Sequence, residues 1–379
     1  MCSNKSMERH SLTLCSPEIG IDPESNLGGA VYDREILKAL AGLGVRVVVP
    51  LPRGEKHDAV ANWEIVPTRR HRWKYYEYNL IFRRAVARLI AEGRTLDIVR
   101  AHSATSTAPG LAGLARRHSI PCHVHYHHWE RHLIRNWIER RTLPRYDLVT
   151  TDSAYSRRTL IERYGLRNPV VVAYPGVGAG YRPGPVDGDL RARYGPKQVL
   201  VFVGALVARK NLSFLLRVVG RLREQGRDDL VLIIAGSGPL EGALRQEAAR
   251  MGVSNAVVFA GHVSEKGKLS YYRLCDVFVF PSLIEGFGMA PAEAMAVGKP
   301  VVAANTTSLP EVIEDGASGF LVAPTDEQGF ADKIAALLDS PERREEMGRA
   351  GQRRVAERFD FGRTAEQMVE IYQKMKSHS

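Results

Sequence analysis

Short apolar runs, rich in β-branched residues, alternate along this chain with longer stretches in which apolar residues recur every three or four positions. The short runs predict buried strands and the longer stretches predict amphipathic helices, an alternation typical of parallel sheets covered by helices. In the first half, strands are expected at residues 12–15, 45–50, 97–100, 122–126, 148–151 and 170–173, with helices that include 31–43, 78–92 and 153–164. In the second half, strands are expected at residues 199–203, 231–235, 257–260, 277–280, 301–303 and 320–322. The pattern therefore predicts two doubly wound α/β units in series.

A segment dense in Gly and Pro separates the two units. Residues 174–185 read YPGVGAGYRPGP, which predicts a hinge or linker because neither residue type continues a helix or a central strand. The chain then ends in a stretch with helical periodicity over residues 363–376.

Length and composition fit a globular protein of two domains. The chain has 379 residues, of which 44% are hydrophobic and 25% charged. It contains no apolar run approaching the roughly 18 residues that a membrane-spanning helix needs. The first ten residues are polar and lack the apolar core of a secretion signal. The four cysteines, Cys2, Cys15, Cys122 and Cys275, have the spacing of neither a zinc site nor a redox pair. We therefore expect a cytoplasmic protein.

The net charge of +11 is concentrated in the first half. Residues 1–180 carry 27 Lys and Arg against 17 Asp and Glu, whereas residues 181–379 carry 26 against 25. Such asymmetry indicates an anionic membrane surface, an acidic acceptor or nucleic acid as a partner. Two basic and aromatic stretches, residues 69–78 and 130–141, have the composition of interfacial segments, and Arg131, Arg135, Arg140 and Arg141 would supply the charge of the second. The alternative for the second stretch is a solvated helix face with Trp137 in the core.

The most informative segment is PSLIEGFGMAPAEAMA, residues 281–296. It follows a predicted strand and opens a helix, so its Gly-rich turn offers backbone N–H groups at the positive end of a helix dipole. Glu285 precedes the helix, and Glu293 is expected in its first turn. N–H groups suit phosphate oxygens and carboxylates suit sugar hydroxyls. A nucleotide diphosphate sugar carries both.

Further candidates follow other predicted strands, where ligands of open α/β sheets bind. After the strand ending at residue 203 the chain reads GALVARKN, so Gly204 is followed by the cations Arg209 and Lys210, which suit a leaving diphosphate. Weaker signals are the turn that begins at Gly236, the loop that contains His262 and Val263, and the pair Gly28 and Gly29, where backbone can approach a ligand closely.

Histidines alternate in residues 122–130, CHVHYHHWE. Alternate histidines on a strand are compatible with a metal site, but no second group of ligands accompanies them, and we expect no metal. His127, with His128 as the rival, is the candidate to hold a sugar hydroxyl, and His102 is a second candidate. Asp187 and Asp189 form an Asp-x-Asp sequence that we interpret as a solvated turn rather than a metal motif.

The string from Glu285 to Glu293 resembles the Glu-x7-Glu motif of the retaining glycosyltransferases of family 4, with Gly-Phe-Gly inside it. Residues 204–210 are similar to the family's Gly-Arg-x4-Lys motif, although Ala205 occupies the Arg position and Arg209 is our candidate for the second cation. Residues 236–239 are similar to its Gly-x-Gly-Pro turn, and residues 174–177 to its Pro-Asn-Gly-Val linker without the Asn.

The resemblance implies a GT-B fold, in which two Rossmann-like doubly wound domains face each other across a cleft. Residues 1–178 would bind the acceptor, residues 179–361 would bind the nucleotide sugar, and a C-terminal helix over residues 362–379 would cross back onto the first domain. The implied reaction is transfer of a hexosyl unit from a UDP- or GDP-sugar to an acceptor hydroxyl with retained configuration, by same-face attack, without metal or other cofactor. The implied partners are the donor and a sugar, lipid-linked or small-molecule acceptor. The basic first half adds the inner face of the membrane to the expected cytoplasmic location.

The resemblance also assigns roles to residues. Lys210 and Arg209 would stabilise the leaving diphosphate, Glu285 would hold the transferred sugar with His127, and Glu293 would hold the ribose. The remaining donor contacts would come from Gly28, Gly29, Gly204, Gly236, His262, Val263, Gly286, Phe287, Gly288 and Met289. One alternative is a phosphorylase of the same family, and another is a nucleic-acid-binding protein, for which the sequence shows no recognisable module.

Overall fold

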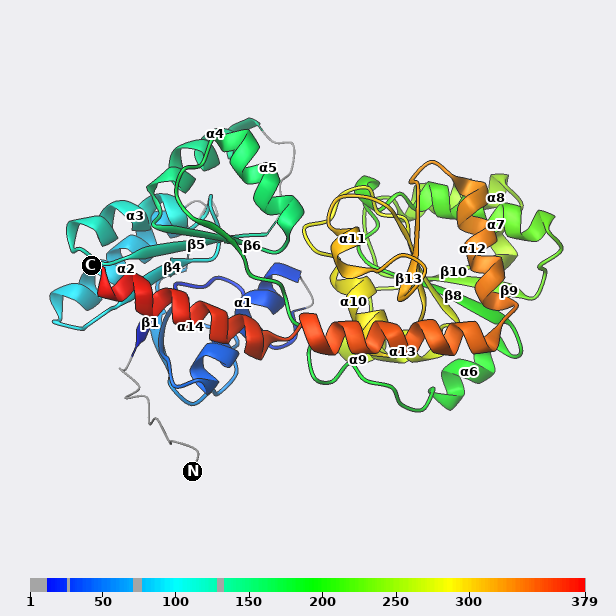
Figure 1. Ribbon diagram of the computed structural model, residues 1–379, viewed down its shortest axis with the longest axis horizontal. Helices are drawn as coiled ribbons and strands as arrows, with labels where there is room; N and C mark the ends of the chain where they lie inside the picture. The colour runs from blue at the N-terminus through cyan, green and yellow to red at the C-terminus, as the bar shows by residue number, and fades with distance from the viewer. Residues whose placement is uncertain (1–11, 26–27, 71–76, 128–132, 379) are drawn as a thin grey trace, which may run out of the picture. The chain divides into compact units, whose positions relative to one another are not determined.

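A computed structural model of the protein describes residues 12–378 except 26–27, 71–76 and 128–132 (Figure 1). The chain divides into two compact units. The first unit comprises residues 1–151, 157–173 and 361–379, and the second comprises residues 152–156 and 174–360. The first unit ends at residue 173, directly before the Gly- and Pro-rich segment, whereas the boundary expected from the sequence lies within that segment, at residue 178.

The first unit is built on a parallel sheet with the strand order β3-β2-β1-β4-β5-β6-β7 among the described residues. Its strands are β1 (Thr13–Cys15), β2 (Arg46–Pro52), β3 (Trp63–Thr68), β4 (Ile98–Ala101), β5 (Cys122–Tyr126), β6 (Leu148–Thr151) and β7 (Val170–Val172). Most of these positions are buried, as expected for a sheet covered on both faces.

The second unit is built on a parallel sheet with the order β10-β9-β8-β11-β12-β13. Its strands are β8 (Gln198–Val203), β9 (Leu230–Ala235), β10 (Val257–Gly261), β11 (Val277–Phe280), β12 (Val301–Ala304) and β13 (Gly319–Val322). Each unit has the strand order of a doubly wound Rossmann-like sheet, which confirms the α/β class and the two domains expected from the sequence.

Helices connect the strands and cover both sheets (Figure 1). Those in the first half of the chain are α1 (Gly28–Gly42), α2 (Tyr78–Ala91), α3 (Ala108–Arg117), α4 (Leu133–Thr142), the short η2 (Leu143–Arg145) and α5 (Ala154–Tyr164). Those in the second half are α6 (Gly188–Tyr194), η3 (Ala208–Lys210), α7 (Leu212–Glu224), α8 (Glu241–Arg250), η4 (Ser254–Ala256), α9 (Glu265–Leu274), α10 (Met289–Ala296), α11 (Leu309–Val312), α12 (Glu327–Leu338), α13 (Pro341–Arg358) and α14 (Phe361–Ser377). Within the described residues, no helix combines the length and apolar character needed to span a membrane.

The last helix, α14, belongs to the first unit although the chain reaches it only after completing the second. Its buried residues Phe361, Ala365, Met368 and Tyr372 join α1 and β2 in one apolar cluster. The expectation that the C-terminal helix returns to the first domain is therefore confirmed.

The sequence did not predict β3, which lies at the edge of the first sheet and pairs with β2. Pro67 falls within β3 and lacks an N–H, which is tolerated because an edge strand has one side without a partner strand. Asp187, read from the sequence as part of a solvated turn, caps α6 by accepting from the backbone N–H of Leu190 at 3.0 Å.

Candidate functional site

Each sheet reverses its strand order at one point. In the first unit the reversal lies between β1 and β4, and in the second between β8 and β11. At such a switch point, the loops after two neighbouring strands diverge to opposite faces and leave a crevice for ligands at the carboxyl ends of the strands. These two places are therefore the candidate sites of the two units.

At the switch point of the second unit, Lys210 after β8 meets Glu285 after β11. The Lys210 Nζ lies 2.6 Å from the Glu285 Oε1, and the Arg209 Nη1 lies 3.3 Å from the same oxygen. The Lys210 and Glu285 side chains are 9% and 11% exposed, whereas the Arg209 side chain is 32% exposed. The sequence placed these three residues together, and the structure brings them into direct contact.

Burial and pairing oppose each other at this site. Burial alone would raise the pKa of Glu285, but Lys210 and Arg209 outweigh it and hold that pKa below its ordinary value. Burial lowers the pKa of Lys210, although the Glu285 carboxylate opposes the shift. The pair is therefore a buried ion pair whose Lys210 ammonium also lies 4.6 Å from the centre of the Phe280 ring.

Hydroxyl groups of neighbouring loops fix the Glu285 segment. The Ser282 Oγ bonds to the Glu285 carboxylate, and the Thr307 Oγ1 accepts from the Glu285 N–H at 3.1 Å. The Ser308 Oγ bonds to the carbonyl oxygens of Glu285 and Phe287 at 3.1 and 2.9 Å. Thr307 has a φ of +47°, an uncommon backbone conformation for a β-branched residue, at the point where its loop approaches Glu285.

Glycines make the loops after β8 and β9 fit against each other. A Cβ on Gly236 would lie 1.9 Å from the Gly204 carbonyl oxygen, and Gly236 has a φ of +150°. A Cβ on Gly238 would lie 2.5 Å from the Leu206 carbonyl oxygen. Backbone therefore contacts backbone here, which explains both glycines of the Gly-x-Gly-Pro turn without reference to a ligand.

Glu293 is buried in a second polar cluster of the same unit. Its Oε2 accepts from the Tyr272 hydroxyl at 2.7 Å, and its Oε1 lies 3.5 Å from the Lys268 Nζ. Lys268 also pairs with Glu265, whose Oε2 accepts from the Tyr181 hydroxyl. Burial raises the pKa of Glu293, in contrast to that of Glu285.

One expectation about Glu293 was wrong. It is the fifth residue of α10, so it lies beyond the first turn, which contains no acidic residue. The reason is that Gly288, with a φ of +110°, forms the N-cap and the helix begins only at Met289. Glu293 therefore points to Tyr272 of α9 rather than capping its own helix.

The other predicted donor contacts differ in exposure. His262, directly after β10, is exposed, while Val263, Gly286 and Met289 are half-buried. The Phe287 ring is buried and packs edge-on against Phe359 at a centroid distance of 5.0 Å. Phe287 therefore serves the core with its side chain, and any donor contact from this residue would come from its backbone.

At the switch point of the first unit, a buried Arg contacts two buried carboxyl groups. Arg100 on β4 bonds to the Glu18 Oε1 at 3.0 Å and to the Asp33 carboxylate, and it is 2% exposed. Burial raises the pKa of Glu18 to about 8, with the Asp33 charge acting in the same direction. Burial opposes ionisation of Asp33 as well, but Arg100 and His127 hold the pKa of Asp33 far below its ordinary value.

His102, a candidate from the sequence, joins this cluster. Its Nδ1 lies 3.0 Å from the Pro17 carbonyl oxygen and 3.2 Å from the Glu18 Oε2. A carbonyl oxygen can only accept, so we place the proton on Nδ1. Burial lowers the pKa of His102, which favours this neutral form.

His127, directly after β5, lies between Gly29 and Asp33. Its Nε2 is 3.5 Å from the Asp33 Oδ2, and a Cβ on Gly29 would approach the ring to 3.2 Å. Gly29 lies in the first turn of α1, next to Gly28. Because Gly29 has no side chain, the His127 ring can pack closely against it. The rival candidate, His128, lies outside the described residues.

The other histidines of β5 have internal partners. His123 Nδ1 lies 2.7 Å from the Tyr372 hydroxyl, and its Nε2 lies 2.7 Å from the Thr150 Oγ1. His125 Nδ1 lies 2.8 Å from the same Thr150 oxygen, and its ring stacks on Tyr32 at 4.1 Å. A hydroxyl has one hydrogen, so Thr150 donates to one ring and accepts from the other.

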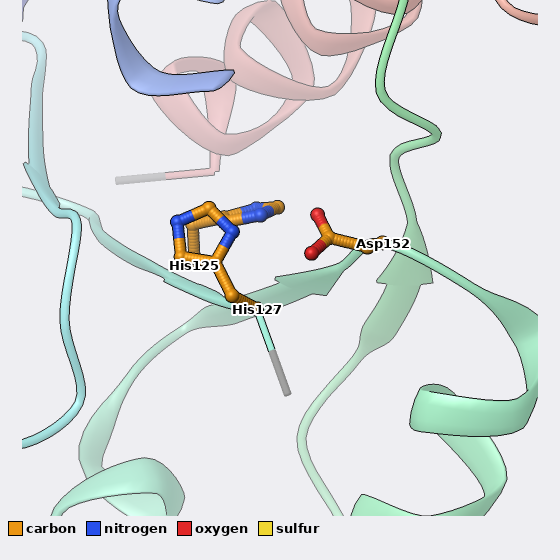
Figure 2. Close-up of side chains that lie close together, drawn as sticks. All are labelled: His125, His127 and Asp152. Carbon is orange, nitrogen blue, oxygen red and sulfur yellow. The ribbon is translucent and has the colours of Figure 1, made fainter. Parts of the chain in front are cut away.

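Asp152 directly follows β6, the neighbour of β5, and lies beside His125 and His127 (Figure 2). Potential ligand atoms of these three residues lie within 4.8 Å of one another. Two imidazoles and a carboxylate are donors that zinc accepts, although the Nδ1 of His125 is already bonded to Thr150. Metal independence therefore stays a prediction that needs its own test.

Sequence reasoning missed Glu18, Asp33, Arg100 and the cluster of Lys268 with Tyr181 and Tyr272. Arg100 carried a signal, because a charged residue inside an otherwise apolar predicted strand requires a buried partner. Its partners Glu18 and Asp33 are 82 and 67 positions away in the sequence, so only the strand order identifies them.

Two family models match the chain. The model described as glycosyl transferases group 1 matches residues 191–354, and the model described as glycosyltransferase family 4 matches residues 28–179. Both candidate sites contain matched residues.

Individual relatives agree with the family models. The D-inositol 3-phosphate glycosyltransferase of Nocardia farcinica is 34% identical over 62% of this chain and 54% of the relative. That of Streptomyces avermitilis is 32% identical over 60% of this chain and 51% of the relative. The chain thus spans about half the length of these two relatives. A GDP-mannose-dependent alpha-(1-6)-phosphatidylinositol monomannoside mannosyltransferase of Mycobacterium tuberculosis is 30% identical over 69% of this chain and 70% of the relative.

Solved structures share the fold. Sucrose-phosphate synthase of Thermosynechococcus elongatus superposes with a TM-score of 0.79 at 20% identity, covering 97% of this chain and 100% of that chain. HepE of Anabaena in complex with UDP superposes with a TM-score of 0.76 at 20% identity, covering 96% of this chain and 100% of that one.

Proposed function

The chain belongs to the group 1 glycosyltransferases of family 4, and on this premise we propose that it transfers a hexosyl unit from a UDP- or GDP-sugar to an acceptor hydroxyl in glycan or glycolipid biosynthesis. The observation that carries the proposal is the Lys210–Glu285 pair at the switch point of the second unit, with Arg209 on the same carboxylate. The second unit binds the donor, and the first unit binds the acceptor.

The chemistry proposed for the pair follows from its charges. Breaking the bond between sugar and nucleotide leaves growing negative charge on the diphosphate, and Lys210 and Arg209 supply the positive charge to stabilise it. Before the donor binds, Glu285 holds both cations, so little reorganisation is needed when the phosphates arrive. Glu285 then accepts from a hydroxyl of the transferred sugar.

The configuration at the sugar carbon is retained in this proposal. Glu285 is committed to two cations and to the Ser282 hydroxyl, which makes it a poor nucleophile. Attack of the acceptor hydroxyl from the face that the diphosphate leaves, with the departing phosphate taking the proton, needs no protein nucleophile. No metal or other cofactor is required in this scheme.

The partner of the basic first half is an anionic membrane surface or an acidic acceptor. The relative from Mycobacterium tuberculosis acts, by its name, on a phosphatidylinositol monomannoside, which supports a lipid-linked acceptor. The protein would then work at the inner face of the membrane.

A panel of UDP- and GDP-sugars tests the function by the nucleotide released with and without candidate acceptors, in the presence and absence of EDTA. The Lys210→Ala variant should lower turnover at least about 100-fold, because it removes charge stabilisation from the transition state. Lys333→Ala, which changes an exposed Lys on α12 of the same unit, is the matched control and should keep its turnover.

Three outcomes would contradict parts of the proposal. Unchanged turnover in a folded Lys210→Ala variant would remove the role of the cation. Product formation that requires inorganic phosphate would favour a phosphorylase. EDTA could abolish the activity of the wild type and Zn²⁺ could restore it. If Zn²⁺ then failed to restore activity in His125→Ala, a metal would be assigned to His125, His127 and Asp152.

A further inference from the structure

Helix α4 presents apolar side chains to water and buries polar ones. Leu133, Ile134 and Trp137 are 90%, 63% and 59% exposed, whereas the residues of α4 that are buried are Glu139 and Thr142. An amphipathic helix of a globular domain normally buries its apolar face. The orientation of α4 is the reverse, so its apolar face lacks a partner within the described chain.

Polar contacts hold α4 in this orientation. Glu139, which is fully buried, accepts from the Tyr164 hydroxyl at 2.6 Å, from the Tyr126 hydroxyl at 3.2 Å and from the Arg135 Nε at 2.7 Å. A buried carboxylate that lost these partners would be strongly destabilising, so the helix cannot rotate to bury its apolar side at low cost. The exposure of Trp137 decides against the interpretation that placed it in the core.

The exposed apolar residues form one patch. Leu133 and Trp137 are one turn apart, and Ile134 adjoins Leu133, so all three lie on the same side of α4. The described chain exposes four other large apolar side chains, and they lie on other elements: Leu80, Val186, Leu283 and Ile284. We call Leu133, Ile134 and Trp137 the α4 patch.

Positive charge lies beside the α4 patch on the same helix. Arg140 and Arg141 are exposed, and the Arg141 guanidinium lies over the Trp137 ring, 3.9 Å from its centre. Residues 133–167, from α4 into the loop after α5, contain eight Arg and four acidic residues, and Glu139 among the latter is buried. Large apolar groups, Trp and Arg on one exposed helix face are the composition of an interfacial segment.

We propose that the α4 patch docks the first unit onto an anionic phospholipid surface. Leu133, Ile134 and Trp137 enter the boundary between headgroups and acyl chains, and Arg140 and Arg141 contact the phosphates. This inference rests on the proposed function and deepens it, because it chooses the membrane over an acidic soluble acceptor and names the contact. Arg135 takes no part, contrary to the expectation from sequence, because it neutralises Glu139; Arg131 lies outside the described residues.

The test is co-sedimentation of the full chain with vesicles of phosphatidylcholine, with and without phosphatidylglycerol. The wild-type protein should bind the anionic vesicles, less strongly in high salt. The triple variant Leu133→Gln, Ile134→Gln, Trp137→Gln should bind at least about tenfold more weakly, because its apolar area no longer leaves water. Arg140→Gln with Arg141→Gln should abolish the preference for phosphatidylglycerol.

The matched control is Leu80→Gln, which changes an exposed apolar residue of α2 in the same unit and should bind like the wild type.

Two further measurements keep the outcomes separate. Without vesicles, all these variants should release nucleotide from the donor at the rate of the wild type. If the wild type itself released no nucleotide, the proposed function would be overturned and the docking inference would not. The tryptophan emission of the wild type should shift to shorter wavelength on adding anionic vesicles, and Trp137→Phe should lose most of that shift, which tests the patch even if the triple variant does not fold.

Three results would overturn the inference. The wild-type protein could ignore anionic vesicles at low salt, or the triple variant could bind them as the wild type does. Alternatively, sedimentation velocity could show a dimer that the triple variant loses, without any vesicle binding, in which case the α4 patch is an interface between copies of this chain.

Discussion

Glu285 and Glu293 lie eight positions apart in one motif, yet their surroundings shift their pKa values in opposite directions. Two cations keep the pKa of Glu285 low despite its burial. Glu293 has a single cation at 3.5 Å and a tyrosine hydroxyl, so burial dominates and raises its pKa. The difference fits the two roles that we propose, in which Glu285 holds the cations Lys210 and Arg209 for the diphosphate and Glu293 holds the neutral ribose.

Conservative variants can separate these two roles. Glu293→Gln should weaken binding of free UDP or GDP, because we assign Glu293 to the ribose hydroxyls. Glu285→Gln should leave the affinity for free nucleotide within a few-fold of wild type and lower turnover at least about 100-fold, because it disturbs the charges around the reacting bond. Isothermal titration calorimetry and turnover measure the two effects.

Tyr272→Phe is the control for indirect effects at Glu293. It removes the hydroxyl that bonds to Glu293 and keeps the ring that fills the core. If Tyr272→Phe weakens nucleotide binding as much as Glu293→Gln does, the effect comes from packing and not from a contact between Glu293 and the ribose. Normal nucleotide binding by Glu293→Gln would remove the assignment.

Glu18 should make the stability of the first unit depend on pH. Its pKa is raised from 4.5 to about 8. Between these two pH values, the folded protein keeps a proton on Glu18 that the unfolded chain has released. The stability that Glu18 contributes is therefore complete below pH 4.5 and is lost as the pH rises towards 8. Glu18→Gln, which imitates the protonated side chain, should lack this loss.

The measurement is the melting temperature of both proteins between about pH 5 and pH 8. The wild type should lose stability relative to Glu18→Gln as the pH rises. A difference that stays constant, or that grows in favour of the wild type, would mean that Arg100 keeps Glu18 ionised throughout. Asp33 cannot mimic the effect, because its pKa is lowered and its contribution is lost only as the pH falls.

Sequence could identify residues that lie in motifs similar to those of a known family, and it failed for residues that no such motif marks. Lys210, Arg209 and Glu285 were recognisable because two loops with known motifs carry them. Arg100, Glu18 and Asp33 come from β4, the loop after β1 and α1, and no local pattern announces their contact. The α4 patch was visible only as composition, because the apolar face of a helix is normally buried and α4 exposes its apolar face.

At the scale of elements, two glycines in helices of the first unit have different reasons to be glycine. Gly29 in α1 lies against His127, where a Cβ would be 3.2 Å from the ring. Gly113 in α3 has open space, with no atom within 4 Å of a built Cβ. Helix propensity favours Ala at both positions by about 0.5–1 kcal/mol, so only the contact with His127 distinguishes them.

Ala substitutions should expose this difference. Gly113→Ala should raise the melting temperature and keep turnover unchanged. Gly29→Ala should lower turnover about tenfold or more if His127 holds the reacting sugar as we propose, because the methyl group would displace its ring. Thermal melts and steady-state kinetics measure both. Full activity in Gly29→Ala would show that the position of His127 does not matter for transfer.

Element boundaries were predictable where apolar runs are buried on both faces. The strands β5, β6 and β11 begin and end where the sequence placed them, since polar or turn residues bound each run. The edge strand β3 was missed because its sequence, WEIVPT, has mixed exposure and contains a proline. Helix α10 begins after Gly288, and this one detail moved Glu293 out of the first turn.

At the scale of the whole molecule, both units repeat one plan, with a buried ion pair at the switch point of a parallel sheet. The pair joins Lys210 and Glu285 in the second unit, and Arg100 and Asp33 in the first. The plan was predictable from alternating strands and helices, whereas the strand order, which determines the switch points, came from the structure. That α14 completes the core of the first unit was expected from the family resemblance and not from the pattern of the residues.

Buried methionines of equal exposure provide a test of how the units respond to the donor. Met368 on α14 belongs to the core of the first unit, and Met347 on α13 to the core of the second; each is 2% exposed. Replacing either by Ala should destabilise its own unit by about 2–5 kcal/mol through lost burial and a cavity. If UDP binds the second unit alone, it should raise only the melting transition of that unit.

Differential scanning calorimetry with and without saturating UDP measures this. The transition that UDP raises should be the one that Met347→Ala lowers, and Met368→Ala should lower the transition that UDP leaves in place. A UDP-sensitive transition that is lowered by Met368→Ala and not by Met347→Ala would place the nucleotide on the first unit. A single transition lowered by both variants would show that the units unfold together, and the nucleotide would then have to be located by the Glu293→Gln titration.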